Sequence, residues 1–447
     1  MKKTVQVIAF LAIAAGFFAT AGCKSDAYKK ASQNAEFTHA GIKKLTDIIR
    51  HDIFAPPISA RIYTYSAVAG YEALLPGYPG YRSLAGQLNG LEKCPQPEAG
   101  KEYCFPLASV NAQLTVGKAL VFSEGDVDDL EDEIFNDFKK MDIPSDVYKR
   151  SMDFGAEIAK HILAWSKKDH YAQLRSAPKF TIQPEIAARW KPTPPQYADA
   201  LEPHWNEMRP WVLDSTSQFK AAAPPAFSTK KGSEMYNLAD NVRETGRKLS
   251  EAQIATAWYW DDNPFATEVS GHVTFARKKI SPGGHWMNIC AHACRKANKN
   301  PMESAEAYVY TSLALADAFI ACWNGKYQYN LLRPETYINQ YIDPTWQPLI
   351  QTPPFPEHPS GHSTISMASA TVLSKVFGEN FSFTDSTEME FNIPSRSFGS
   401  FREASKEAGE SRVLGGIHFQ TGNQSGLALG KEVGDFILQK VKTRTAN

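Results

Sequence analysis

Apolar residues recur at intervals of three and four positions along most of this chain, and this periodicity constrains its fold more than any other feature. The pattern runs almost continuously from Phe37 to about Trp165 and returns near Gly232. Such spacing gathers apolar side chains on one face of an α-helix. The sequence lacks strand-like alternation over several consecutive segments, and its 447 residues are enough to bury a large core. We therefore predict an all-α protein built as a large helical bundle.

Proline-rich breaks divide the helical pattern. Prolines interrupt helices because they lack an N–H group and clash with the preceding turn, and residues 171–230 are rich in proline and carry three tryptophans. A long irregular insertion in a compact domain is usually functional or covering. We interpret this segment as a layer over a site, with a plain connector as the alternative. We predict an N-terminal helical region at 23–230 and a C-terminal helical region at 231–447.

The first 22 residues are typical of an export signal. Two lysines precede an apolar stretch from Val7 to Phe18, and Cys23 follows two small residues. This ending resembles a bacterial lipobox, which predicts that residues 1–22 are a lipoprotein signal peptide and that Cys23 is acylated. An ordinary secretory signal is the alternative. We expect an exported protein that is anchored to the cell envelope, on its periplasmic or outer-membrane face, only by the N-terminal lipid.

The cysteine and charge content limits the disulfides and the binding partners that we expect. Export permits disulfides, and Cys94 and Cys104 bracket a loop with proline and glycine, so we predict a bond between them. Cys290 and Cys294 lie one helical turn apart, which suits neither a disulfide nor a metal set. Forty-eight basic residues match forty-eight acidic ones, so we expect no nucleic-acid partner. The aromatic-rich loops are compatible with a dimer.

The tetrapeptide Pro359-Ser360-Gly361-His362 stands directly before a helical run that ends at Gly378. The start of a helix has unpaired backbone N–H groups and partial positive charge, which favour an anion. A serine cap followed by a packing or surface histidine is the simpler interpretation of this tetrapeptide alone.

Two further segments supply cations. Lys326 and Arg333 are seven residues apart, so a continuous helix would place both side chains on one face. Arg412 and His418 flank a glycine-containing turn before the final helix. A solvated basic face would explain the first pair alone, but the three segments together are not explained in that way.

The order Lys-x6-Arg-Pro, Pro-Ser-Gly-His and Ser-Arg-x5-His resembles the three-part signature of the type 2 phosphatidic acid phosphatase superfamily, which includes the vanadium-dependent haloperoxidases. The resemblance covers about residues 305–440. The segments 50–74, 260–264 and 271–286 also look like those of secreted bacterial relatives that are grouped with the haloperoxidases. The resemblance implies a helical bundle with an anion site between core helices.

The resemblance also implies a role for each motif residue. Lys326, Arg333 and Arg412 would grip the oxygens of phosphate or vanadate. Ser360 and the backbone N–H of Gly361 would complete the anion cradle at the helix start. These groups would supply the charge stabilisation without a metal cation.

The two motif histidines serve either chemistry. In a phosphatase, His418 would attack phosphorus, and His362 would protonate the leaving alcohol and then activate water. In a haloperoxidase, His418 would coordinate vanadium and His362 would assist peroxide binding. Phosphate and vanadate have the same charge type and nearly the same shape, so the cradle does not distinguish them.

Four more residues are supporting candidates. Asp261 and Asp262 could pair with Arg412, as an acidic residue does in related haloperoxidases, or they could simply belong to a helix-ending turn. His285 and His358 could line the entrance of the site, and a surface or packing role is the alternative for both.

One position departs from the resemblance. Relatives commonly carry an aspartate four residues after the nucleophilic histidine, where a carboxylate orients the imidazole. Gly422 occupies this position here. Asn423 or a carboxylate from elsewhere could substitute, and a catalytically weak relative is a further option.

Our main prediction is a metal-independent phosphohydrolase that acts on small phosphate monoesters through a phosphohistidine and needs no cofactor. The alternative is a vanadate-dependent haloperoxidase, which uses vanadate as cofactor and halide and hydrogen peroxide as substrates. A third hypothesis is a lipid-anchored phosphate- or vanadate-binding protein that has lost catalysis.

Overall fold

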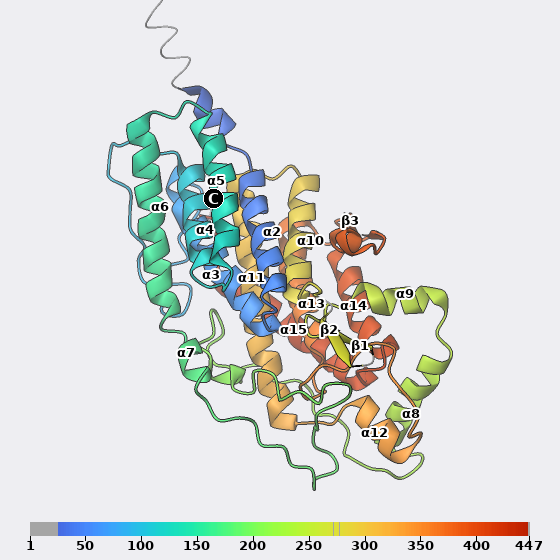
Figure 1. Ribbon diagram of the computed structural model, residues 1–447. Coiled ribbons are helices and arrows are strands. Elements are labelled where there is room, and N and C mark those ends of the chain that lie inside the picture. Colours follow the sequence, from blue (N-terminus) through green and yellow to red (C-terminus); the bar gives the residue numbers. More distant parts are fainter. Residues whose placement is uncertain (1–25, 271, 277, 446–447) are drawn as a thin grey trace, which may run out of the picture.

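The computed structural model describes residues 26–270, 272–276 and 278–445 and shows an elongated helical bundle (Figure 1). The N-terminal region contains α2 (Glu36–His51), α3 (Pro56–Leu74), α4 (Phe105–Lys118), α5 (Glu124–Lys139), α6 (Ser145–Ser166) and the short α7 (Tyr171–Leu174). The C-terminal region contains α8 (Glu234–Arg247), α9 (Glu251–Tyr259), α10 (Pro282–Lys296), α11 (Pro301–Tyr329), α12 (Pro334–Tyr341), α13 (Gly361–Phe377), α14 (Phe401–Leu414) and α15 (Gln420–Lys440). The prediction of an all-α fold is confirmed.

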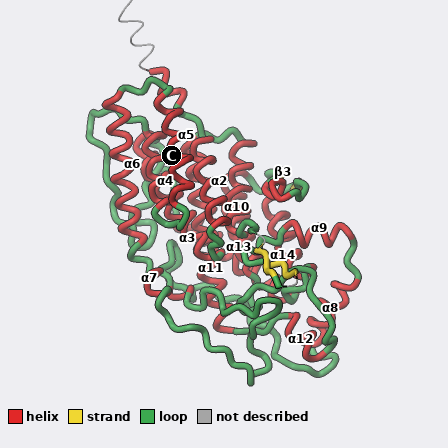
Figure 2. Tube along the Cα trace, viewed as in Figure 1, coloured by secondary structure: helices red, strands yellow, loops and turns green. Residues whose placement is uncertain are grey.

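Short strands and turns complete the structure. Strand β1 (Thr267–Ser270) pairs antiparallel with β2 (Val273–Ala276), and β3 (Phe383–Asp385) pairs antiparallel with β4 (Arg396–Phe398). The 3-10 turns are η1 (Leu75–Gly77), η2 (Trp205–Glu207) and η3 (Thr387–Phe391). In Figure 2 the irregular segments gather around one end of the bundle.

Helix α11 is the centre of the bundle. Almost every residue between Pro301 and Lys326 is buried, because α3 packs along one side of α11 and α13 and α15 along others. The hydroxyl of Thr64 in α3 donates to the carbonyl of Ser312 in α11 at 3.0 Å. One continuous cluster of buried apolar side chains therefore joins the N-terminal and C-terminal regions.

Glycines bring α13 and α15 into close contact. Gly422, Gly426, Gly430 and Gly434 repeat every fourth residue, so they lie on one face of α15. A methyl group on Gly426 would lie 2.7 Å from the carbonyl oxygen of Ser360. These two backbones therefore pack without intervening side chains, and the start of α13 is held against the start of α15.

The proline-rich segment 171–230 wraps the end of the bundle that carries the site motifs. The backbone N–H of Trp190 donates to the carbonyl of Asn330 at 3.0 Å, and that of Leu201 donates to the carbonyl of Pro354 at 2.9 Å. Farther along, the N–H groups of residues 211–213 donate to the buried carboxylate of Asp317. The segment therefore supports the loops behind the site from outside.

The predicted disulfide is absent from the structure. Cys94 and Cys104 are both buried free thiols. The Cys94 thiol lies 4.0 Å from the carbonyl oxygen of Glu92, whereas the Cys104 thiol lies beside Ser32. The two thiols therefore have different neighbours in the structure.

The predicted signal peptide and the acylated Cys23 lie outside the described residues. Across the described part of the chain, no helix combines the length and apolar character that crossing a membrane requires.

Candidate active site

Lys326 lies in the last turn of α11 and Arg333 stands just before α12, so the continuous helix that would place both side chains on one face is not formed. Helix α11 ends at Tyr329, and Asn330 follows with φ 48° and ψ 44°, a left-handed conformation that asparagine tolerates at a helix end. Arg333 is the N-cap of α12, in extended conformation before Pro334. Proline disfavours a helical residue before it and begins helices well. The two cations are thus brought together by a sharp turn.

The Lys326 ammonium is fully buried and held by backbone carbonyls. It donates to the carbonyl oxygens of Pro356 at 2.9 Å, Glu357 at 3.1 Å and Pro359 at 2.6 Å. Burial lowers the pKa of Lys326 to about 7. This lysine therefore fixes the loop before Ser360 and changes its charge readily.

The two arginines have buried N–H groups without partners. Arg333 donates through Nε to Phe355 and through Nη1 to Ile417, both at 2.8 Å, and Arg412 donates through Nη1 to Trp260 at 2.7 Å. Nη2 of Arg333 and both Nε and Nη2 of Arg412 are buried with no hydrogen-bond acceptor. Unpaired buried guanidinium groups are costly. Their positions fit an anion.

The tetrapeptide at the start of α13 forms the next wall. Ser360 is the N-cap, and its side chain accepts the backbone N–H of Ser363. The N–H groups of Gly361 and His362 stand in the first turn, where no intrahelical acceptor is available. The predicted helix-start site is therefore adjacent to Lys326, whose Cε would lie 3.9 Å from a methyl group on Gly361.

His418 is oriented by a carboxylate that the sequence patterns did not mark. Its Nδ1 donates to Glu357 Oε1 at 2.7 Å, and Nη1 of Arg333 lies 3.1 Å from its Nε2. Because a guanidinium can only donate, Nε2 carries a lone pair and Nδ1 carries the proton. Burial, followed by the charges of Arg333 and Lys326, lowers the pKa of His418 well below its usual value.

Glu357 belongs to the same buried group. It also accepts the backbone N–H of Phe419 at 3.0 Å, and burial raises its pKa to about 7 against the opposing effect of nearby cations. Asn423, the other substitute considered for the missing aspartate, instead accepts a hydrogen bond from the hydroxyl of Ser363 at 2.9 Å. The one sequence signal for Glu357 was the glycine at position 422.

His362 lies on the opposite side of the pocket, near Asp262. Its Nε2 is 3.8 Å from Asp262 Oδ2 and has no hydrogen-bond partner. Burial, with the positive charges of Arg412 and His285, lowers the pKa of His362 well below its usual value. His362 is therefore a neutral imidazole with a free ring nitrogen, as acid–base chemistry requires.

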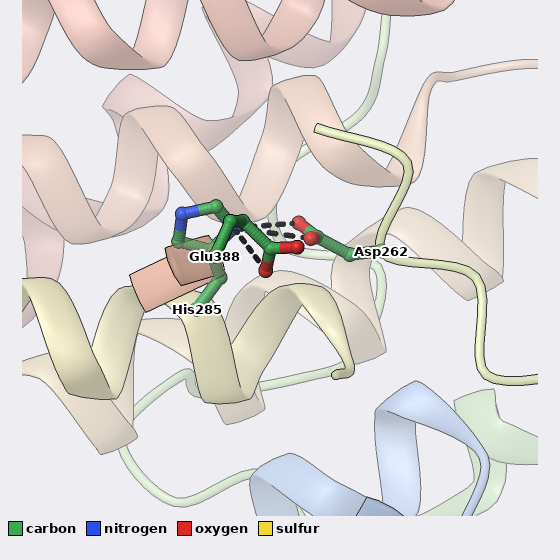
Figure 3. A group of neighbouring side chains, drawn as sticks. All are labelled: Asp262, His285 and Glu388. Carbon is green, nitrogen blue, oxygen red and sulfur yellow. Dashed lines mark hydrogen bonds and ion pairs between the residues drawn. The ribbon is translucent and has the colours of Figure 1, made fainter. Parts of the chain in front are cut away.

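His285 is the centre of a buried carboxylate network (Figure 3). Its Nδ1 lies 3.0 Å from Asp262 Oδ1 and 3.9 Å from Glu388 Oε1, and its Nε2 lies 2.7 Å from Asp385 Oδ2. Burial would lower the pKa of His285, but Asp262 and Asp385 outweigh it and hold the pKa well above its usual value. The imidazolium thus holds Asp262 in place beside His362.

This network also contains residue types that bind metals. Asp262, His285 and Glu388 present ligand atoms within 4.8 Å of one another. Both ring nitrogens of His285 already contact carboxylates, and burial raises the pKa of Glu388 to about 8. Hydrogen bonds from His285 therefore explain the positions of Asp262 and Asp385 without a metal ion.

The remaining candidates lie beside the pocket. Asp261 accepts a hydrogen bond from Lys279 at 3.0 Å, and its negative charge and that of Asp262 both attract Arg412 without a direct hydrogen bond. His358 is fully buried, where Nε2 lies 2.7 Å from the carbonyl oxygen of Ala222. Neither His285 nor His358 is among the described residues that line the pocket, so the predicted place at its entrance is corrected for both.

The pocket is narrow, with a cavity volume of about 30 Å³. Asp262, His362, Arg412 and His418 supply polar groups to its lining. Its apolar wall is formed by Pro56, Pro264, Phe265, Pro282, Phe319, Trp323, Pro353 and Phe355. No described residue of the 171–230 segment lines the pocket, so the predicted covering layer lies behind the site.

Comparison with known proteins agrees with this geometry. A family model described as the VCPO second helical-bundle domain matches residues 306–447. The crystal structure described as the first bacterial vanadium-dependent iodoperoxidase is similar, with a TM-score of 0.87 and 43 % identity over 93 % of this chain and 99 % of that chain. None of the curated protein sequences gives a significant match.

More distant structures share the fold. A holo-type bacterial vanadium-dependent chloroperoxidase has a TM-score of 0.65 and 16 % identity, over 87 % of this chain and 93 % of that chain. Its apo-type counterpart has a TM-score of 0.64 and 16 % identity, over 87 % and 95 %. The helical bundle, the anion pocket and the iodoperoxidase likeness together define an enzyme of the haloperoxidase kind. The chain belongs to the superfamily of type 2 phosphatidic acid phosphatases and vanadium-dependent haloperoxidases.

Proposed function

We propose that this protein is a vanadate-dependent haloperoxidase, which oxidises a halide with hydrogen peroxide. The observation that carries the proposal is the 43 % identity to the bacterial iodoperoxidase over 99 % of that chain. The cationic pocket alone suits phosphate equally well. The relationship therefore favours the haloperoxidase alternative over the phosphohydrolase that we predicted from the motifs.

The pocket residues fit vanadate chemically. Three unpaired guanidinium N–H positions on Arg333 and Arg412 are suited to the oxygens of a tetrahedral oxyanion. The Nε2 lone pair of His418 would become the ligand for the metal centre of that oxyanion once its 3.1 Å contact with Nη1 of Arg333 is released, and Nη1 would keep its hydrogen bond to the carbonyl of Ile417. When bound, vanadate would act as a Lewis acid that activates hydrogen peroxide.

The protein residues would divide the remaining work. Arg412 lines the pocket and Nη2 of Arg333 is buried without a partner, so both guanidinium groups would attract the oxyanion more strongly than they would in water. Lys326, whose ammonium donates to three backbone carbonyls, would add positive charge from behind the loop. His362 would accept a proton at Nε2 and return it, since that nitrogen is free and neutral. The apolar wall around Trp323 and Phe355 limits water near the oxidised halogen.

One preparation tests the proposal. The protein is depleted of oxyanions, and iodide and bromide oxidation by hydrogen peroxide is measured with and without added orthovanadate. We expect activity only after vanadate loading, with inorganic phosphate as a competitor. Vanadate-loaded protein that oxidises neither halide would contradict the proposal.

A phosphohydrolase is the second candidate, because a Glu357-oriented His418 also suits attack on phosphorus. The same preparation is assayed with p-nitrophenyl phosphate. If the haloperoxidase proposal is right, hydrolysis is weak and vanadate suppresses it. Strong hydrolysis without halide oxidation would reverse the order of the two candidates.

We also propose that the protein is exported and lipid-anchored through Cys23, as its N-terminal sequence predicts. Mass spectrometry of the protein from its native host, with Cys23→Ser as the comparison, tests this directly. Soluble, unacylated wild-type protein would contradict the anchor.

A further inference from the structure

The contact between Glu357 and Gly422 explains the departure of this chain from the motif of its relatives. Glu357 is fully buried, and its Oε1 accepts both the Nδ1 proton of His418 and the backbone N–H of Phe419. The Glu357 backbone N–H donates to the carbonyl of Leu331 at 2.9 Å. Hydrogen bonds therefore hold both the backbone and the side chain of Glu357 in place.

Gly422 supplies the space that this carboxylate occupies. A methyl group on Gly422 would overlap Oε1 of Glu357 and would lie 2.9 Å from its Cδ and 3.0 Å from its Oε2. The backbone carbonyl of Gly422 accepts the N–H of Ser360 at 3.0 Å, so α15 cannot simply move away. A side chain at position 422 and the carboxylate of Glu357 therefore exclude each other.

We propose that Glu357 is the positioning residue of His418, and that the Glu357–Gly422 pair is a compensated exchange for an aspartate at position 422. This inference rests on the proposed function, because it assumes that His418 Nε2 acts on the bound oxyanion. Glu357 holds the proton on Nδ1, and Arg333 faces the lone pair on Nε2. A carboxylate thus reaches the imidazole from the loop before α13 and not from α15.

The test exchanges the carboxylate between the two positions. The variants are Glu357→Gln, Glu357→Ala, Gly422→Asp and the double variant Glu357→Ala with Gly422→Asp. Two measurements are made: the dissociation constant of orthovanadate by equilibrium dialysis, and the tautomer of His418 by ¹⁵N NMR of histidine-labelled protein. A His418→Gln spectrum assigns the signal.

Removing the partner of a ligating histidine typically weakens metal binding about 10- to 100-fold. We expect a loss of this size in Glu357→Ala, together with a mixture of His418 tautomers. Gly422→Asp alone should unfold at lower temperature because two carboxylates then compete for one space. The double variant should recover the Nδ1–H tautomer and bind vanadate within about tenfold of the wild type. Glu357→Gln keeps an oxygen that can accept the Nδ1 proton but lacks the negative charge, so it should keep the Nδ1–H tautomer and bind vanadate with an affinity between those of Glu357→Ala and the wild type.

Glu72→Gln is the matched control. Glu72 is another buried glutamate that accepts a backbone N–H, from Leu84, but it lies in α3 away from the pocket. Glu72→Gln should lower the unfolding temperature of the protein without changing the His418 tautomer. The proposal is overturned if Glu357→Ala leaves both the tautomer and the vanadate affinity unchanged, if the double variant is no better than Glu357→Ala, or, where Glu357→Ala does not fold, if the folded double variant lacks the Nδ1–H tautomer. Because neither measurement needs halide oxidation, a wild-type protein without that activity would refute the proposed function separately.

Discussion

The two histidines of the pocket have opposite surroundings. His418 faces Arg333 on one ring nitrogen and Glu357 on the other, so both its nitrogens have partners. His362 has an unpartnered Nε2, 3.8 Å from Asp262, a carboxylate held by His285. Burial lowers the pKa of both histidines, yet only His418 has a carboxylate hydrogen-bonded to its ring, whereas Nε2 of His362 is free. The difference separates a group that holds the oxyanion from a group that moves protons.

The largest expected effect comes from removing either histidine, because the two have different roles. His418→Ala should abolish both vanadate retention and halide oxidation, because the Nε2 ligand is lost. His362→Ala should retain vanadate and lower turnover about 10²- to 10⁴-fold, the usual contribution of one acid–base group. Equilibrium dialysis and iodide oxidation measure the two properties. Equal loss of vanadate from both variants would contradict the division of roles.

A smaller effect is expected from the network behind His362. The positive charge of His285 lowers the pKa of His362, so His285→Gln should raise that pKa and move the acidic limb of the kcat/KM profile to higher pH. We expect turnover to fall about tenfold as Asp262 loses its support. The pH–rate profile gives both values.

His39→Gln is the control for this variant, since His39 is a buried histidine that contacts Tyr308 away from the pocket. It should leave the pH profile unchanged.

The interpretation of the network around His285 as a hydrogen-bonded group without a metal can also be tested. One equivalent of tightly bound metal in the wild-type protein, measured by mass spectrometry, would contradict it.

Lys326 predicts a proton linkage on the His418 side. Its pKa of about 7 leaves it mostly neutral at pH 8, and a bound anion favours the charged form. Oxyanion binding at pH 8 should therefore take up close to one proton more in the wild type than in Lys326→Met. Calorimetry in two buffers of different ionisation enthalpy measures this difference. Equal uptake by the two proteins would contradict the low pKa.

The smallest effect concerns the apolar wall. The ring of Phe355 lies 4.9 Å from both the Lys326 ammonium and the Arg333 guanidinium. Such contacts contribute at least about 0.5 kcal/mol, so Phe355→Leu should weaken vanadate binding at least about twofold by dialysis. Phe381→Leu, which removes a similar ring near Lys296, is the control. A loss equal to that of His418→Ala would show that Phe355 has a larger role.

The sequence predicted the helical architecture because periodicity and proline breaks are local signals. Helix α13 begins at Gly361 and ends before Gly378, as expected. The relation between Lys326 and Arg333 could not be predicted from spacing alone, because it depends on the turn at Asn330. Local patterns define helices, but the angle between successive helices depends on tertiary packing.

The site residues were also only partly predictable from the sequence. Motif spacing identified the arginines and both pocket histidines, whereas Glu357 lacks a distinctive pattern of its own. Its role depends on a contact across 61 positions with His418 and on the space left by Gly422. The predicted Cys94–Cys104 bond failed for a related reason, since loop composition does not determine where two thiols point.

The shared core also has a consequence for protein engineering. The cationic groups come from the last third of the chain, but Pro56 of α3 and Pro282 of α10 contribute to the pocket wall. A chimaera that imports only residues 306–447 would carry both arginines and both pocket histidines, but it would lack Asp262, which lies beside His362, and the wall residues Pro56 and Pro282. The two regions therefore have to be exchanged together if the pocket is to keep both its shape and the surroundings of His362.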